Sequence, residues 1–172
     1  MKRLKAVVMV GLLGISALSY ANDVYIQQAG NSSTIDIVQQ GIGNSIGNSI
    51  TSIYIGGGSN TVTIEQIGDS NVLAMVVNGS AAASALSYTG SDNTVTINCG
   101  TTVSAGCSSS TINHTVVGDT NTITQNLGGG ANHTSNITIT GDTNTVTHTS
   151  SATGTTTMNA TIAGNLNELT VT

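Results

Sequence analysis

The side chains of this sequence that could take part in chemistry are three histidines, two cysteines and eight carboxylates. His114, His133 and His148 lie where an alternating pattern would direct them inward, and they could line one seam and bind a metal ion. No two of them, however, have a spacing typical of metal ligands. No Ser-His-Asp grouping stands apart from the repeats, and no Lys or Arg follows Lys5 to stabilise an oxyanion or a phosphate. We therefore expect no enzymatic activity, no metal centre and no cofactor.

Three of the carboxylates share one sequence position. Asp69, Asp119 and Asp142 each follow a glycine that recurs along the chain, so they could stack as an acidic edge. Calcium could bridge such a row, but the calcium-binding nonapeptide Gly-Gly-x-Gly-x-Asp is absent. We interpret these side chains as solvated turn residues.

The two cysteines are close in sequence. Cys99 and Cys107 enclose the segment Gly-Thr-Thr-Val-Ser-Ala-Gly. In an exported protein such a pair is expected to form a disulfide, which would stabilise so short a loop by about 2–3 kcal/mol. Two free thiols in a loop are the alternative.

The first residues predict export. Lys2, Arg3 and Lys5 precede an apolar run over residues 6–18, and Ser19-Tyr20-Ala21 places small residues where a signal peptidase cleaves. This pattern predicts a signal peptide over residues 1–21, cleaved after Ala21. A membrane anchor is the alternative, but the run is short for a bilayer and no charged stop follows it. We expect a secreted protein at the surface of a bacterial cell, with no membrane span in the mature chain.

Cleavage would change the charge of the chain. Residues 22–172 contain no Lys or Arg and keep all eight acidic residues, so the formal charge becomes −8. Binding to phosphates of nucleic acids requires basic side chains, and so does attraction to an anionic membrane surface. Both classes of function are excluded for the mature chain.

The chain is built from a repeat with the pattern Gly-x-x-Asn-x-(Val/Ile/Leu). Successive glycines are separated by 11, 16, 11, 22, 28, 23 and 23 residues, so the unit is about 11 residues and is often doubled. The turn glycines are Gly30, Gly41, Gly57, Gly68, Gly90, Gly118, Gly141 and Gly164.

Each repeat predicts a strand, a turn and a strand. Apolar residues alternate on both sides of every glycine, and Gly and Asn tolerate the positive φ of tight turns. Two half-repeats would make one flattened coil of about 22 residues. Stacked coils give an all-β, amyloid-like β-solenoid of six or seven coils.

Polar residues recur on the side predicted to face inward. Amides in register can form ladders along a stack, each bonding to its copies above and below. Asn could also simply serve the turn, whereas Gln has no such role. The predicted inner ladder comprises Gln28, Gln39, Gln66, Ser33, Asn44, Asn60, Asn71, Asn93, Asn121, Asn144 and Asn167.

These motifs resemble a known family. The run Ser33-x5-Gln39-x-Gly41-x-x-Asn44-x-Ile46 is similar to the curlin repeat, Ser-x5-Gln-x-Gly-x-x-Asn-x-Ala-x3-Gln, and the 11-residue phasing is similar to that of the minor, nucleating subunits. The resemblance implies an extracellular amyloid fibre of a biofilm matrix that serves adhesion. It also implies partners: further copies, other curlin-type subunits, and an outer-membrane secretion pore with accessory factors.

The resemblance covers residues 22–79. From Gly90 onward no Gln lies two residues before a repeat glycine, and segments rich in Gly, Ser and Cys separate the repeats. We expect residues 80–172 to be divergent Thr/Asn-rich coils that continue the same domain as a cap, a display surface or a tail adapted to secretion.

Two further expectations concern the edges and the outer face. Natural proteins protect strand edges with Lys, Pro or caps, and the mature chain has neither Lys nor Pro, which favours pairing with other copies. The alternative is that loops 78–87 and 98–111 cover the ends.

On the outer face, paired threonines resemble the flat surface of ice-binding solenoids, so a monomeric adhesin or ice-binding protein is the alternative function. The pairs are Thr61 and Thr63, Thr94 and Thr96, Thr122 and Thr124, and Thr145 and Thr147.

Overall fold

The computed structural model describes residues 5–10, 23–41, 43–47, 52–79, 82–100, 107–130, 132–151 and 153–172. All regular secondary structure in these ranges is β-strand. Within the same ranges there is no helix with the length and apolar character that crossing a membrane would require.

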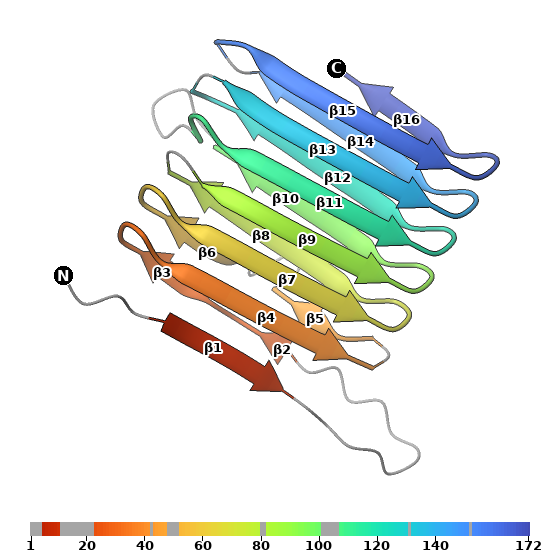
Figure 1. Cartoon of the computed structure of the whole chain (residues 1–172), viewed down its shortest axis with the longest axis horizontal. Coiled ribbons are helices and arrows are strands. Elements are labelled where there is room, and N and C mark those ends of the chain that lie inside the picture. The colour runs from red at the N-terminus through yellow and green to blue at the C-terminus, as the bar shows by residue number, and fades with distance from the viewer. Residues whose placement is uncertain are drawn as a thin grey trace.

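The strands form two parallel sheets that face each other (Figure 1). In the described part of the chain, sheet A has seven strands: β1 (Lys5–Val10), β4 (Thr34–Gln40), β7 (Thr61–Ile67), β9 (Ala83–Thr89), β11 (Thr111–Val117), β13 (His133–Thr140) and β15 (Thr156–Ala163). Sheet B has nine, of which the first four are short: β2 (Asp23–Val24), β3 (Gln27–Ala29), β5 (Ser45–Ile46), β6 (Ile53–Gly56), β8 (Val72–Asn78), β10 (Thr94–Cys99), β12 (Thr122–Gly128), β14 (Thr145–Ser151) and β16 (Glu168–Val171).

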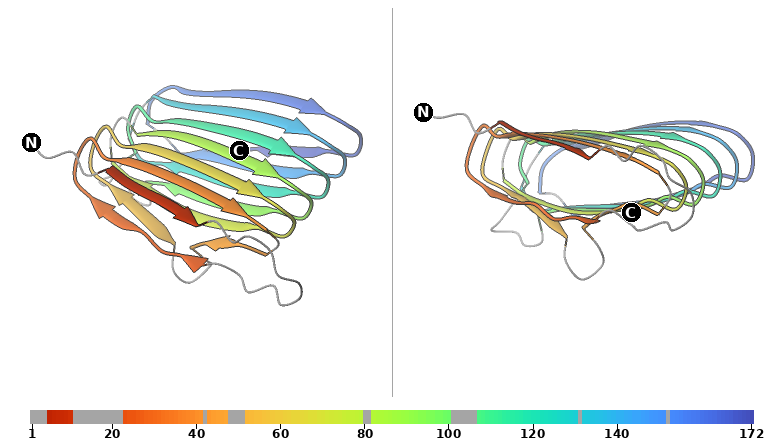
Figure 2. Two further views of the ribbon diagram at one scale, coloured as in Figure 1. Left: turned by 60° about the horizontal axis from the view of Figure 1, so that its bottom comes forward. Right: turned by 90° about the horizontal axis from the view of Figure 1, so that it is seen from below.

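The chain alternates between the two sheets and adds one layer at each pass. Viewed along the stack, it traces a flattened ring (Figure 2). Equivalent residues of successive coils are 27, 22, 28, 23 and 23 residues apart. The predicted β-solenoid is therefore confirmed, with about six turns.

Two arcs connect the sheets. Arc I runs from sheet A to sheet B and contains Gly41, Gly68, Gly90, Gly118, Gly141 and Gly164. Arc II runs from sheet B to sheet A and contains Gly30, Gly57 and Gly79 in the first coils. Up to Gly68 the repeat glycines therefore occur on both arcs, and after it they occur only on arc I. The spacing between successive repeat glycines therefore changes from about half a coil to a full coil.

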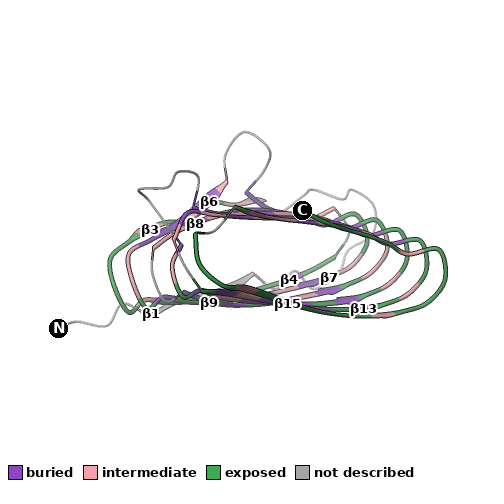
Figure 3. Cartoon of the chain, turned by 90° about the horizontal axis from the view of Figure 1, so that it is seen from above, coloured by how far each residue is buried: buried purple, intermediate pink, exposed green. Residues whose placement is uncertain are grey.

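The inner faces form one continuous core. In β4 the exposed and buried residues alternate along the whole strand, as expected when one face of a sheet is packed. Buried positions recur along the strands of both sheets, and much of each arc is exposed or half-buried (Figure 3). Ile, Val and Leu dominate this core, which also contains buried Asn, Gln and His.

β1 lies within the predicted signal peptide. It pairs in parallel with β4, with Lys5 opposite Thr34. The predicted cleavage position, Ala21, lies outside the described residues. If cleavage occurs there, β4 becomes the first strand of sheet A.

Candidate functional site

The turns of arc I have one recurring backbone geometry. The glycine has a φ between 131° and 139° in the five turns from Gly68 to Gly164, and the residue two positions later has a φ near 60°, as in Ser70 and Thr120. The asparagine three positions after the glycine has no positive φ in these turns. This Asn does not use its tolerance of a positive φ, so its recurrence at one position of the repeat has another reason.

That reason is a hydrogen-bond ladder along arc I. Oδ1 of Asn121 accepts the backbone N–H of Asn93 at 2.9 Å. Nδ2 of Asn121 donates to the carbonyl of Gly118 at 2.9 Å and to Oδ1 of Asn144 at 3.0 Å. The same backbone-to-side-chain bond links each successive pair of the series Asn44, Asn71, Asn93, Asn121, Asn144 and Asn167. The ladder therefore joins successive coils, and Asn71, Asn93 and Asn121 also close their own turns by donating to the turn glycine.

We expect Asn121→Ala to lower the free energy of unfolding by about 2–4 kcal/mol, because it leaves the buried N–H of Asn93 without an acceptor. Urea unfolding followed by circular dichroism measures the change. Asn126→Ala is the matched control, since the Asn126 amide bonds to Asn98 on the outer face. A loss in the control as large as that in Asn121→Ala would contradict the role of the inner ladder.

The remaining predicted ladder residues lie elsewhere. Ser33 and Asn60 are on arc II, where Oδ1 of Asn60 accepts the N–H of Ser33 at 3.0 Å. Gln66 donates to Oε1 of Gln39 at 2.9 Å, so these two glutamines do stack in sheet A. Gln28 does not join them, because it lies in sheet B opposite Ile55 and donates to Ser33 of its own coil. A single ladder of three glutamines is therefore a wrong prediction.

Two ladders on the outer faces were not predicted. Nδ2 of Asn136 donates to Asn113 at 2.7 Å, and Nδ2 of Asn159 donates to Asn136 at 2.8 Å, across three strands of sheet A. Asn126 bonds to Asn98 at 2.8 Å on sheet B. The signal was present in the sequence, because Asn113, Asn136 and Asn159 each lie five residues before a repeat glycine.

The carboxylates of arc I bond to the backbone. Oδ1 of Asp119 accepts the N–H of Asp142 at 2.6 Å, and Oδ1 of Asp69 accepts the N–H of Ser91 at 2.8 Å. These carboxylates are exposed to solvent. Their arrangement matches the interpretation as solvated turn residues that add one more bond between coils.

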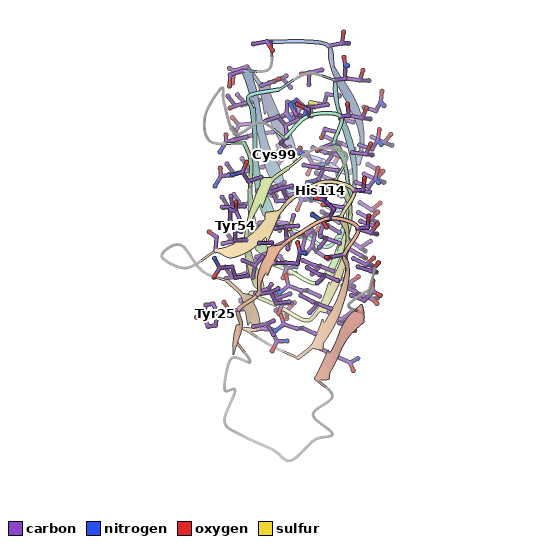
Figure 4. The ribbon with its side chains drawn as sticks, turned by 90° about the vertical axis from the view of Figure 1, so that its left-hand side faces the viewer. Tyr25, Tyr54, Cys99 and His114 are labelled. Carbon is purple, nitrogen blue, oxygen red and sulfur yellow. A yellow bond between two sulfur atoms is a disulfide. The ribbon has the colours of Figure 1, made fainter. Side chains whose placement is uncertain are left out.

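The cysteines and histidines belong to the interior. Cys99, at the end of β10, is joined to Cys107 by a disulfide, and both are buried. His114, His133 and His148 are each about 1 % exposed. Figure 4 shows the side chains that fill the space between the sheets, with His114 inside and Tyr25 outside.

Burial changes the acid–base properties of His114. Its ring stacks on that of Tyr88, with centroids 6.3 Å apart, and neither ring nitrogen bonds to a described residue. Desolvation, and secondly the charge of His148, lower the pKa of His114 to about 4. Desolvation, and secondly His133, also lower the pKa of His148. Burial therefore favours the neutral imidazole at His114 and His148.

We expect the protein to lose stability in acid. The pKa of His114 is about 4 when folded and about 6.5 when unfolded, so between these pH values the unfolded chain binds the extra proton. The contribution of His114 is complete above pH 6.5 and is lost as pH falls towards 4, by up to about 3 kcal/mol. Urea unfolding at several pH values measures this slope. In His114→Leu the new side chain would lie between Leu86 and Ile137 of the adjacent strands. The dependence of the unfolding free energy on pH should become shallower in this variant. An unchanged dependence would refute the role of His114 in the loss of stability.

The two ends of the stack expose inner-face residues. At the C-terminal end, Leu169 and Val171 of β16 are 40 % and 55 % exposed, although their equivalents in β14, Val146 and His148, are buried. At the N-terminal end, Val24, Ile26 and Gln28 are half-buried. The predicted alternative that residues 78–87 cover an end is wrong, because β9 lies in the middle of sheet A. Of the segment 98–111, residues 101–106 lie outside the described residues, and the remainder flanks β10 and β11 within the stack.

Comparison with protein-family models, with curated proteins and with solved structures finds no match for this chain. The case for a function therefore depends on the geometry of the ends, the ladders and the outer faces.

Proposed function

We propose that the mature chain is an exported structural protein that forms or nucleates extracellular amyloid-like fibres by stacking copies end to end. The observation that carries this proposal is the match between the two open ends. Each end exposes a layer whose residue types are those that pack against one another inside the solenoid.

The register of the interior predicts the contacts of such a junction. In sheet B, Val24 is followed along the stack by Ile46, Leu73, Val95, Ile123, Val146 and Leu169. Continuing the series would place Leu169 against Val24 of the next copy, and Val171 against Ile26. Both contacts join apolar side chains, so stacking would remove apolar surface from water at both ends.

The ladders would continue as well. Asn167 ends the ladder of arc I, and Asn44 begins it. The register that places Leu169 against Val24 would place Asn167 against Asn22 of the next copy, because each of these residues lies two positions before its partner in the series. Asn22 lies outside the described residues. In sheet A the same register leaves the place of one strand between β15 and β4 of that copy, the place that β1 occupies in this structure. The absence of Lys and Pro from the mature chain leaves these edges without the residues that usually prevent pairing.

Electron microscopy and fibre diffraction of unseeded residues 22–172 at neutral pH test this function. We expect unbranched fibres with a meridional reflection near 4.8 Å, the spacing between strands. A stable soluble monomer with a β-type circular dichroism spectrum would contradict it. A truncation to residues 22–79 would then show whether the curlin-like part alone drives assembly.

A second candidate, ice binding by a monomer, is favoured by the outer face of sheet B. Thr94, Thr122 and Thr145 form one row there, and Thr96, Thr124 and Thr147 form the next. Adjacent strands are about 4.8 Å apart and alternate residues about 6.7 Å, so the six hydroxyls form a regular array. Thr61 and Thr63 do not join it, because they lie in sheet A. Thermal hysteresis of the monomer, absent in Thr122→Lys, would support this function.

A further inference from the structure

The disulfide of Cys99 and Cys107 lies beside a buried histidine. The two Sγ atoms and a ring nitrogen of His133 all lie within 4.8 Å of one another. Cys99 and Cys107 are fully buried, and His133 is 1 % exposed. Cys99 ends β10, whereas His133 begins β13 in the following coil, so stacking brings together residues that are far apart in sequence.

One ring nitrogen of His133 bonds to the backbone, and the other is buried without a partner. Its Nε2 lies 2.9 Å from the carbonyl oxygen of Gly129. Because a carbonyl only accepts hydrogen bonds, Nε2 carries a proton, and loss of any proton from Nδ1 leaves that atom a free lone pair for a metal ion. Nδ1 is buried and has no hydrogen-bond partner among the described residues. Ligating histidines commonly donate the other ring N–H to a backbone carbonyl in this way.

We propose that Cys99, Cys107 and His133 bind one thiophilic cation, Zn²⁺, when the disulfide is reduced. Two thiolates and an imidazole are a ligand set that zinc prefers, with a fourth position left for water or another ligand. Ligand atoms of tetrahedral zinc are about 3.3–3.8 Å apart, given Zn–S and Zn–N bonds of about 2.3 and 2.0 Å. A group already within 4.8 Å therefore needs shifts on the order of 1 Å.

The exchange between the two states balances. A dithiol reductant transfers two electrons and two protons to the disulfide, giving two thiols, and is itself oxidised to a disulfide. Zn²⁺ then binds both sulfurs as thiolates and releases two protons. A disulfide oxidant reverses the sequence: it takes two electrons from the thiolates and two protons from solution, becomes two thiols, and Zn²⁺ leaves as Cys99 and Cys107 join.

Either state links Cys99, at the end of β10, to Cys107. Disulfides do not persist in reducing compartments, so the metal would make this link before export and the disulfide would make it afterwards. The proposal is independent of fibre formation, because the group lies inside one chain and far from both ends of the stack.

Titration with Co²⁺, a spectroscopic substitute for Zn²⁺, tests the site. In the reduced protein under anaerobic conditions we expect one equivalent of Co²⁺ to give thiolate-to-cobalt absorbance that Zn²⁺ abolishes. The oxidised protein should give none. His133→Ala should raise the dissociation constant at least about tenfold, and Cys99→Ser should remove the absorbance. His114→Gln, which changes an equally buried ring outside the group, should bind like the wild type.

Circular dichroism of the same samples separates binding from folding. Restoration or retention of the β spectrum by Zn²⁺ in the reduced protein is the expected result. A reduced protein that stays folded but binds no Co²⁺, a His133→Ala variant that binds normally, or a reduced chain that unfolds and is not rescued by Zn²⁺ would each overturn the proposal.

Discussion

Gly118→Ala is expected to lower the free energy of unfolding by more than about 4 kcal/mol, a loss that only severe steric or burial defects produce. A Cβ atom at this position would lie 2.1 Å from the carbonyl oxygen of Gly90 and 2.7 Å from its carbon. Both are backbone atoms of the adjacent coil, which no rotamer change can move. The N–H of Gly118 donates to Thr140 at 2.9 Å, so the glycine is held from the other side as well. Its φ of +135° adds strain for any residue with a Cβ.

Gly43→Ala separates the two causes. Gly43 also has a positive φ, +69°, but a Cβ there would meet no atom within 4 Å. Its substitution should therefore cost only the conformational strain, about 1–2 kcal/mol. Urea unfolding of dilute monomer measures both variants. Equal losses in Gly118→Ala and Gly43→Ala would mean that coil contact along arc I does not require glycine.

The sequence predicts the solenoid because recurring glycines and alternating apolar residues define the length of the repeat. It does not reveal on which arc each glycine lies, since a half-repeat and a full coil share the same motif. Gly79 is one turn glycine that the motif does not identify, because no Asn follows it at the motif spacing. It lies next to Gly57 on arc II, where an ideal Cβ at Gly79 would be 1.7 Å from the carbonyl oxygen of Gly57. The motif does not reveal the place of Gln28 either: it shares the motif position of Gln39 and Gln66 but lies in sheet B, whereas they stack in sheet A.

The interior contacts between distant repeats were harder to predict. His133 lies 26 residues after Cys107, and no sequence spacing indicates that their side chains meet. The contact depends on the insertion between β10 and β11, which breaks the regular repeat on arc II. By contrast, the outer ladder of Asn113, Asn136 and Asn159 followed a regular spacing and was open to prediction.

Val171→Asp is expected to stop assembly at the C-terminal end while leaving the monomer folded. Val171 is 55 % exposed in the last strand, so a carboxylate there remains hydrated in the free chain. In a stacked junction it would be buried against Ile26 of the next copy without a partner, which costs at least about 3 kcal/mol. That penalty corresponds to a rise of about 100-fold in the concentration needed for fibre growth.

Thr170→Asp is the matched control, because Thr170 alternates with Val171 in β16 and pairs with Thr147 of the outer Thr row. It adds the same charge to the same strand outside the junction, so its fibres should grow almost as the wild type does. Seeded growth measured by light scattering compares the two variants. Small amounts of Val171→Asp should also arrest wild-type fibres, because this variant still offers an intact N-terminal layer but presents a charged end once added. If Val171→Asp fibres grow at the wild-type rate, the coils do not join through the layer of β16, and end-to-end stacking is not the mode of assembly.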